Sequence, residues 1–312
     1  MSGYGSKLRS VWLILAATLL GDIPGYAVET AVTFTPVGGS EVIPATLLVP
    51  DGIGPFPAVV IAHDCSGLGP RSSGAPGRWA QLLFDQGYAV ILPDSFTPRD
   101  LPRGVCTETP ARGRMASDGV RAGDVYGALN FLRGLPQVDG TRIGIMGGSH
   151  GGSTTLSAMY EPAHETDPLF SATRAGFVAA VGLYPRCGGT YGTWSVMRAR
   201  NGPGPVTGYS GVYKPIAPLL ILIGESDDWT PAEPCQRLVD ISKAAGFPLD
   251  IKVYPGAHHS FDSNNPTRYV AERNNFNAQG GRGATTGGDP KAWADARQQV
   301  SQFFAQHLKR RP

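Results

Sequence analysis

The sequence has few charged residues and, before Lys309–Arg311 at its C-terminus, no run of basic ones. Only 17% of its 312 residues are Asp, Glu, Lys or Arg, and the formal net charge is +2. Binding to nucleic acid needs clustered Lys and Arg, so no nucleic-acid partner is predicted. The hydrophobic fraction of 41% supplies a large core and argues against disorder over most of the chain.

Apolar runs long enough to cross a membrane are also missing. The longest one near the N-terminus, Val11–Leu20, has about half of the ~20 residues that a membrane-spanning helix needs. Lys7 and Arg9 precede it, and the small residues of Gly25–Ala27 follow it in the positions that a signal peptidase reads. This pattern predicts a secretory signal peptide, with an uncleaved anchor as the less favoured alternative. The mature protein is expected to be exported, periplasmic or extracellular, without stable membrane insertion.

Cysteine is scarce, and none of the four cysteines forms a CxxC pair. A zinc ribbon and a thioredoxin-like redox site are therefore not predicted. Their even number in an exported chain predicts two disulfide bonds, for which three pairings are open. The residues are Cys65, Cys106, Cys187 and Cys235.

Short apolar segments rich in β-branched residues alternate with helical patterns. The eight predicted strands are Thr30–Thr35, Ala45–Val49, Ala58–Ala62, Tyr88–Leu92, Arg142–Met146, Phe177–Leu183, Leu219–Ile223 and Ile251–Tyr254. Thr230-Pro231 is predicted to begin one helix, with Thr230 as its cap, and Asp289-Pro290 to begin the last. This alternation predicts an α/β fold: an eight-stranded, mostly parallel sheet with helices on both faces.

Two stretches rich in Gly and Asn interrupt this pattern, at residues 188–211 and 264–288. We interpret them as long loops inserted in one domain, not as linkers between two. The predicted organisation is a signal peptide over residues 1–27 followed by one domain over residues 28–312.

One glycine-rich turn carries the strongest chemical signal. The segment Gly147–Gly151 reads G-x-S-x-G, and it stands between an apolar strand and a helical stretch. In such a turn the Ser hydroxyl projects clear of the backbone, and glycines on either side avoid a clash. The N-terminus of the following helix directs free N–H groups towards a developing oxyanion. Ser149 is therefore the predicted nucleophile.

A nucleophilic serine needs a base and an acid that orients the base, in the chain order Ser, acid, His. Two adjacent aspartates, Asp227 and Asp228, follow the seventh predicted strand. Two adjacent histidines, His258 and His259, follow the eighth. The residues alone leave both choices open, and either aspartate is also a candidate cap for the next helix.

The segments Gly147–Gly152, Gly224–Pro231 and Pro255–Phe261 together resemble the dienelactone hydrolase family of α/β-hydrolases. That family commonly shows G-x-x-D-x-x-x-P after one strand and P-G-A-x-H-x-F after the next. The resemblance covers about residue 40 to the end, and it implies Asp227 as the acid and His259 as the base.

The same resemblance implies an oxyanion hole made by two backbone amides. One donor is the residue after the nucleophile, His150, and the other is Cys65 in the loop after the third predicted strand. His63 and Asp64 in that loop are interpreted as residues that shape it. No cofactor is implied.

The chain departs from the family's namesake at the nucleophile, where the lactone-opening enzymes carry Cys and this chain carries Ser149. It therefore resembles general esterases more closely, and the expected partner is a small-molecule carboxylic ester or lactone. Two alternatives remain: a serine peptidase on the same fold, or a catalytically silent binding protein.

In the sheet of an α/β-hydrolase, the strands before Cys65 and Cys106 are neighbours, and so are the strands before Cys187 and Cys235. The resemblance therefore implies the pairs Cys65–Cys106 and Cys187–Cys235. Both bonds would tie loops at the active-site edge, each contributing roughly 2–4 kcal/mol.

Several further residues lie in loops at the same edge. Arg99 and Arg103 are candidates to bind a substrate carboxylate, or to pair with Asp100 and Glu108 instead. Trp229 is a candidate substrate-binding residue, and with it Trp194, Tyr191 and Tyr213 either line a pocket or anchor loops. No metal site is predicted, because the histidines lack the spacing that ligands need.

Overall fold

A computed structural model describes residues 29–309, apart from 163–165, 168, 175 and 199–203. The predicted signal peptide, residues 1–27, lies outside the described residues. Within the described ranges, no helix has the length and apolar character needed to cross a membrane.

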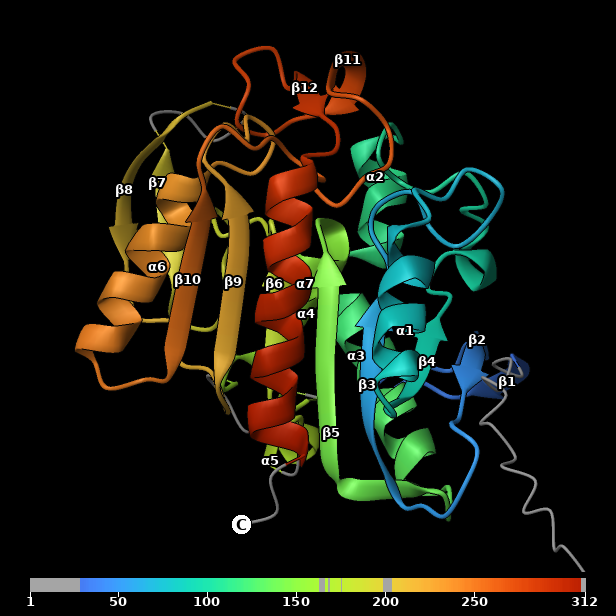
Figure 1. The fold of residues 1–312 in the computed structure, drawn as a ribbon. Helices are drawn as coiled ribbons and strands as arrows, with labels where there is room; N and C mark the ends of the chain where they lie inside the picture. The colour runs from blue at the N-terminus through green and yellow to red at the C-terminus, as the bar shows by residue number, and fades with distance from the viewer. Residues whose placement is uncertain (1–28, 163–165, 168, 175, 199–203, 310–312) are drawn as a thin grey trace, which may run out of the picture.

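Eight strands form the central sheet, in the order β1-β2-β4-β3-β5-β6-β9-β10 (Figure 1). Neighbours are parallel except β1 with β2 and β2 with β4. The strands are Thr30–Phe34 (β1), Ile43–Leu48 (β2), Phe56–Ala62 (β3), Ala89–Pro93 (β4), Val138–Gly148 (β5), Ala180–Leu183 (β6), Leu219–Gly224 (β9) and Leu249–Tyr254 (β10). The predicted eight-stranded, mostly parallel sheet is confirmed, although β5 is longer and β6 is shorter than the predicted segments.

Helices cover both faces of the sheet, which is why its central strands are apolar throughout. Every residue of β9 is buried, and so is every residue of β3 after Phe56. In Figure 1, α1 and α7 lie in front of the sheet, and α3 and α4 lie behind it. The helices are Ala75–Asp85 (α1), Pro110–Gly113 (α2), Asp118–Arg133 (α3), His150–Met159 (α4), Phe170–Arg174 (α5), Ala232–Ala244 (α6) and Pro290–Phe304 (α7).

Helix starts follow the predicted pattern in one case and depart from it in another. The Asp289 side chain accepts hydrogen bonds from the amides of Lys291 and Ala292 and caps α7 as expected. The predicted cap of α6 was wrong: its N-cap position is Pro231, without a side-chain cap. The hydroxyl of Thr230 is instead used inside the site described below.

The two glycine-rich segments were interpreted from the sequence as long loops, and this is only partly right. Each contains a pair of antiparallel strands, Ser195–Arg198 (β7) with Val206–Ser210 (β8) and Arg268–Asn274 (β11) with Arg282–Thr286 (β12). The β11–β12 hairpin lies beyond the C-terminal ends of the central strands, at the top of Figure 1, with α2 nearby.

Both disulfide bonds lie at this same edge. Cys65 is bonded to Cys106, which joins the loops after β3 and β4, and Cys187 is bonded to Cys235, which joins the loop after β6 to α6. This is the pairing that the neighbouring strands implied. The bonds fix three loops around the C-terminal edge of the sheet.

Candidate active site

Ser149 occupies a strained turn between β5 and α4. Its backbone has φ 55° and ψ −117°, a conformation that side chains rarely adopt. The flanking glycines are required by space, because a Cβ on Gly147 would overlap the backbone of Gly151 and one on Gly151 would overlap the carbonyl of Ala62. The packing of α4 against β3 and β5 therefore explains the G-x-S-x-G pattern.

Three side chains form a continuous hydrogen-bonded chain at this turn. The Ser149 Oγ lies 2.8 Å from Nε2 of His259, and Nδ1 of His259 lies 2.7 Å from Oδ2 of Asp227. All three residues are buried, with His259 fully so. The geometry matches that of a nucleophile, a base and an orienting acid.

The structure separates the two adjacent aspartates. Asp227 faces His259, while its other carboxylate oxygen accepts from the amides of Trp229 and Thr230. Asp228 points away and binds the backbone amide and hydroxyl of Thr285 on β12. Asp227 thus belongs to the hydrogen-bonded chain, and Asp228 holds the β11–β12 hairpin.

The two histidines differ in the same way. His259 lies within the chain of side chains, whereas Nδ1 of His258 bonds to the carbonyl of Ser226. A parallel bridge between His259 and Thr286 fixes the loop that carries the base against β12.

Thr230, which was predicted to cap a helix, is a member of this site. Its hydroxyl lies 2.9 Å from Oδ2 of Asp227, 3.0 Å from Nδ1 of His259 and 3.0 Å from the carbonyl oxygen of Tyr184. It therefore steadies the acid and the imidazole together. The Trp229 ring covers the imidazole, with 4.7 Å between the ring centroids.

Two residues with backbone amides that are unbonded in the described part of the chain, Cys65 and His150, line the same cavity as Ser149. His150 is the first residue of α4, so its amide is one of the free N–H groups at a helix N-terminus. Within the described chain, no protein acceptor binds the amide of His150 or of Cys65. Both are thus available as oxyanion donors.

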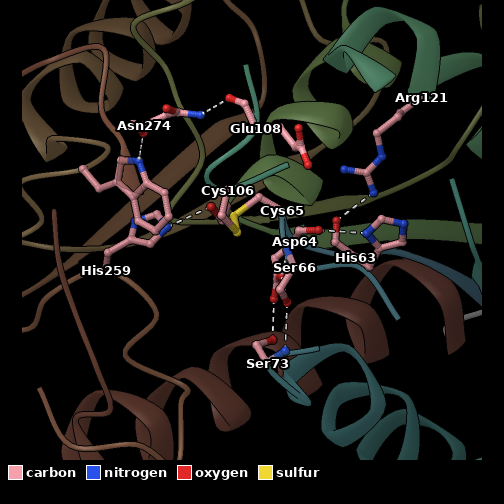
Figure 2. The surroundings of a disulfide bond; sticks show 12 residues. His63, Asp64, Cys65, Ser66, Ser73, Cys106, Glu108, Arg121, His259 and Asn274 are labelled. Atoms are coloured by element: carbon pink, nitrogen blue, oxygen red, sulfur yellow. Dashed lines mark hydrogen bonds between the residues drawn. A yellow bond between two sulfur atoms is a disulfide. The ribbon is translucent and has the colours of Figure 1, made fainter. Parts of the chain in front are cut away.

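The loop that carries Cys65 is held from three directions (Figure 2). The buried Arg121 donates through Nη2 to the carbonyl of His63 at 2.7 Å. The carboxylate of Asp64 accepts from the Ser66 amide at 2.7 Å and from the hydroxyl of Ser73. The disulfide to Cys106 completes the support. His63 and Asp64 therefore shape the loop, in keeping with the prediction.

A cavity of about 300 Å³ opens beside Ser149. It is lined by Cys65, Val105, Cys106, Pro110, Gly113, Arg114, Ser117, Asp118, Ser149, His150, Ser153, Arg186, Trp229, Thr230 and Asn274. Trp229 thus lines the cavity as predicted. Tyr191, Trp194 and Tyr213 do not, and their buried rings anchor the β7–β8 region instead.

The substrate-binding assignment of Arg99 was wrong, whereas that of Arg103 stays a prediction. Arg99 is buried and forms a bidentate ion pair with Asp124 of α3, with both N–O distances at 2.8 Å. The charge of Arg99 is therefore neutralised by Asp124 inside the protein and does not reach the cavity. Arg103 is exposed and lies outside the lining of the cavity. Arg112, not either of these, pairs with Glu108 and Asp100.

The cations that do line the cavity are Arg114 and Arg186, which come from distant parts of the chain. Arg186 is engaged, since its Nη2 lies 3.0 Å from Asp118, which also lies 3.0 Å from Nε2 of His150. Burial raises the pKa of Asp118, but the hydrogen bonds from His150 and Arg186 and the Arg186 charge outweigh it, and the pKa is lowered. Asp118, itself held by Arg186, therefore fixes the side chain of His150, the residue after Ser149.

Two histidines resist protonation, the fully buried His63 in the loop that carries Cys65 and the largely buried His150 at the start of α4. Burial lowers the pKa of His63 well below the ordinary value of 6.5, and the charge of Arg121 lowers it further. Burial and Arg121 also lower the pKa of His150, despite its bond to Asp118. Both imidazoles are therefore neutral at neutral pH.

This neutrality predicts a loss of stability in weak acid. Below pH 6.5 the unfolded chain takes up a proton on His63 that the folded chain does not, so the unfolded state binds more protons and stability falls with falling pH. Each such histidine contributes a slope of up to about 1.4 kcal/mol per pH unit. We expect His63→Gln, which keeps an acceptor for the amide of Ser95, to show a shallower decline than wild type when urea unfolding is measured between pH 7.5 and 5. Equal slopes would contradict this account.

No group of three metal-ligating side chains occurs among the described residues.

The sheet order, with a serine on the turn after β5, defines an α/β-hydrolase. The chain belongs to the dienelactone hydrolase family, whose sequence pattern matches residues 43–308. As a member of this family it is a hydrolase that acts on esters.

The individual proteins that resemble this chain share a low fraction of identical residues with it. A protein of Methylorubrum extorquens provisionally named carboxymethylenebutenolidase is 26% identical over 234 residues, covering 74% of this chain and 72% of that protein. Human mitochondrial acyl-coenzyme A thioesterase 2 is 26% identical over 300 residues, covering 84% of this chain and 55% of the thioesterase, so the chain spans about half of that relative. The apo structure of Thermogutta terrifontis esterase 2 has a TM-score of 0.59 at 15% identity, covering 91% of this chain and 96% of the esterase, a likeness of fold.

Proposed function

We propose that this protein is a serine hydrolase that cleaves a carboxylic ester or lactone through an acyl-enzyme intermediate. The observation that carries the proposal is the unbroken chain from Ser149 through His259 to Asp227, with distances of 2.8 and 2.7 Å, on a strained turn beside a cavity. The family supplies the class of bond that is cleaved.

Acylation begins when the Ser149 Oγ attacks the ester carbonyl and His259 Nε2 takes the hydroxyl proton. The negative charge that develops on the carbonyl oxygen is bound by the amides of Cys65 and His150. As the tetrahedral intermediate collapses, the bond to the alcohol oxygen breaks and His259 returns the proton to that oxygen. Asp227 holds the imidazole in the tautomer that carries its proton on Nδ1 and stabilises the imidazolium between these transfers.

Deacylation repeats these steps with water. His259 takes a proton from a water molecule whose oxygen attacks the acyl carbonyl, and the same amides bind the second oxyanion. Collapse breaks the bond to Ser149 Oγ, which receives the proton from His259, and the free acid leaves. A lactone follows the same course, except that its alcohol oxygen stays joined to the acyl chain, so deacylation releases a single hydroxy acid.

A fluorophosphonate probe tests the nucleophile directly. We expect a single adduct on Ser149, located by mass spectrometry, none on Ser149→Ala, and turnover of short-chain p-nitrophenyl esters by the wild type. Hydrolysis of a peptide p-nitroanilide at a comparable rate would favour a peptidase. Absence of both labelling and turnover in the folded protein would favour a catalytically silent binding protein.

The two disulfide bonds support export independently of the chemistry. Disulfide bonds persist in oxidising compartments, and the two in this chain hold the loops of the site. Together with the predicted signal peptide, they support a periplasmic or extracellular location for the mature protein.

A further inference from the structure

A second cleft, of about 160 Å³, is also lined by Ser149 and by the Cys65–Cys106 disulfide. It shares Ser149, Trp229 and the disulfide with the first cavity, but its other walls are the loop after β3, the loop after β10 and the β11–β12 hairpin. The residues that line this cleft but not the first cavity are Asp64, Ser66, Arg71, Ser72, Ser73, Ser260, Ser263, Asn265, Arg268, Arg273, Thr286 and Gly287.

Three guanidinium groups line this cleft, those of Arg71, Arg268 and Arg273. Within the described ranges, none of them has a carboxylate within ion-pairing distance. Arg99 and Arg186, by contrast, each form an ion pair with an aspartate. A cleft lined by three cations, none of them in an ion pair among the described residues, is a site of positive potential.

Arg273 is the most constrained of the three. Its guanidinium lies 5.1 Å from the centre of the Trp229 ring, the same ring that covers His259. Its Nε is buried without an acceptor among the described residues. A buried donor without a partner is costly, so this guanidinium is ready for an anionic ligand.

The cleft contains one carboxylate, that of Asp64, and its acceptors are already engaged. Its oxygens bind the amide and hydroxyl of Ser66 and the hydroxyl of Ser73. Three guanidinium charges against one carboxylate leave an excess of two positive charges, which matches a phosphate dianion better than a single carboxylate.

The position of the cleft assigns it to one side of the scissile bond. Its walls include Ser260, directly after the base, and Thr286, which bridges to His259. The first cavity is instead walled by His150 and Ser153 of α4. Trp229 and Thr230 of the first cavity also contact His259, but only the second cleft is lined by the loop that carries it. Because His259 delivers its proton to the departing alcohol, we place the leaving group in the cleft that this loop lines.

We propose that Arg71, Arg268 and Arg273 form a subsite for a phosphate group on the alcohol side of the substrate. This inference rests on the proposed function, since it gives the cleft its place relative to the ester bond. The protein would then act on esters whose alcohol part is phosphorylated, with the acyl group in the first cavity. Guanidinium groups suit this task, because their paired donors match the oxygens of a phosphate.

Binding tests the subsite without any turnover. Calorimetry with phenyl phosphate, benzoate and phenol on the wild-type protein is expected to give measurable binding of phenyl phosphate, at least about tenfold tighter than benzoate. The affinity should fall with added NaCl, because the cleft is open to solvent. Equal affinities for the phosphate and the carboxylate, or no binding of phenyl phosphate, would overturn the proposal.

Matched variants locate the binding. Arg273→Gln and Arg268→Gln are expected to weaken phenyl phosphate by about tenfold each, a typical loss for a charge-assisted hydrogen bond. Arg282→Gln removes the same charge from the exposed end of the same hairpin, outside the cleft, and should change nothing. A loss with Arg282→Gln as large as with Arg273→Gln would reduce the effect to general surface charge and refute the subsite.

Kinetics connects the subsite to the reaction. 4-Acetoxyphenyl phosphate and phenyl acetate differ only by the phosphate, and we expect kcat/KM to favour the former by about tenfold or more in wild type but not in Arg273→Gln. Turnover of phenyl acetate with no preference for the phosphate would refute the subsite and leave the ester hydrolase intact. Tight phosphate binding with no turnover of either ester would refute the proposed function and leave the binding site intact.

Discussion

Asp227→Asn is expected to lower kcat by about 10⁴-fold, the size of effect seen when a triad acid becomes an amide. The side chain keeps its shape and its acceptor for the amides of Trp229 and Thr230. It no longer supplies an anion 2.7 Å from Nδ1 of His259, so neither the productive tautomer nor the imidazolium is stabilised. The measurement is the steady-state hydrolysis of p-nitrophenyl acetate by the purified variant.

The adjacent residue provides the matched control. Asp228→Asn removes a carboxylate one position away, but that carboxylate binds Thr285 on β12 and does not touch the imidazole. We expect its kcat to match the wild type, with a thermal melt to show that both variants are folded. A larger loss from Asp228→Asn than from Asp227→Asn would show that the acid is assigned to the wrong residue.

The sharp turn that carries Ser149 could be predicted from the sequence because its structural requirements are local. The sharp turn needs glycine at Gly147 and Gly151, and a strand and a helix must flank it, so the whole arrangement is written in about fifteen consecutive residues. Strands β3, β4, β6 and β9 were predictable for a similar reason, since burial on both faces makes them continuously apolar.

The choice between the adjacent residues Asp227 and Asp228 could not be made from local sequence alone. Asp227 and Asp228 both follow β9, and only the spacing within the family pattern favoured the first. What separates them in the structure is the β11–β12 hairpin, which binds Asp228 from a point 57 residues further along the chain. This hairpin could not be predicted from the sequence, because β11 is largely exposed and neither strand has an alternating apolar pattern.

Arginine roles were the least predictable feature. An arginine in a loop at the active-site edge looks the same in sequence whether it faces a cavity or turns inwards. Arg99 turns inwards because Asp124, on α3, lies where its guanidinium can reach. Arg273 and Arg268, which reach the nucleophile's cleft, lie in a segment that had been interpreted as a loop. Both outcomes depend on contacts between segments that are distant in sequence.

The oxyanion loop shows how such distant contacts serve the chemistry. The amide of Cys65 must be held still, yet it lies in a loop with no regular structure. Arg121 from α3, Ser73 before α1 and Cys106 from the loop after β4 each bind it or a neighbouring residue. A rigid donor is what electrostatic stabilisation requires, because a donor that must reorient during the reaction loses part of its effect.

The buried pair of Arg99 and Asp124 predicts the largest effect on stability. Both side chains are almost completely enclosed, at 4% and 0% exposure, and they meet in a bidentate arrangement. Removing one member leaves an unpaired charge in the protein interior, and such changes cost about 3–5 kcal/mol. We therefore expect Arg99→Met to lower the free energy of unfolding by that amount in urea denaturation.

The second member of the pair decides whether this loss reflects the ion pair or only altered packing. In Arg99→Met the carboxylate of Asp124 remains buried without its partner, so replacing it as well, in Arg99→Met with Asp124→Leu, should restore part of the lost stability. The double variant is then more stable than the sum of the two single losses predicts, because each single change strands a charge and the double change strands none. Strictly additive losses in this cycle would show that the two side chains are not coupled, and that the contribution of Arg99 comes from packing and its bond to the Ser95 carbonyl.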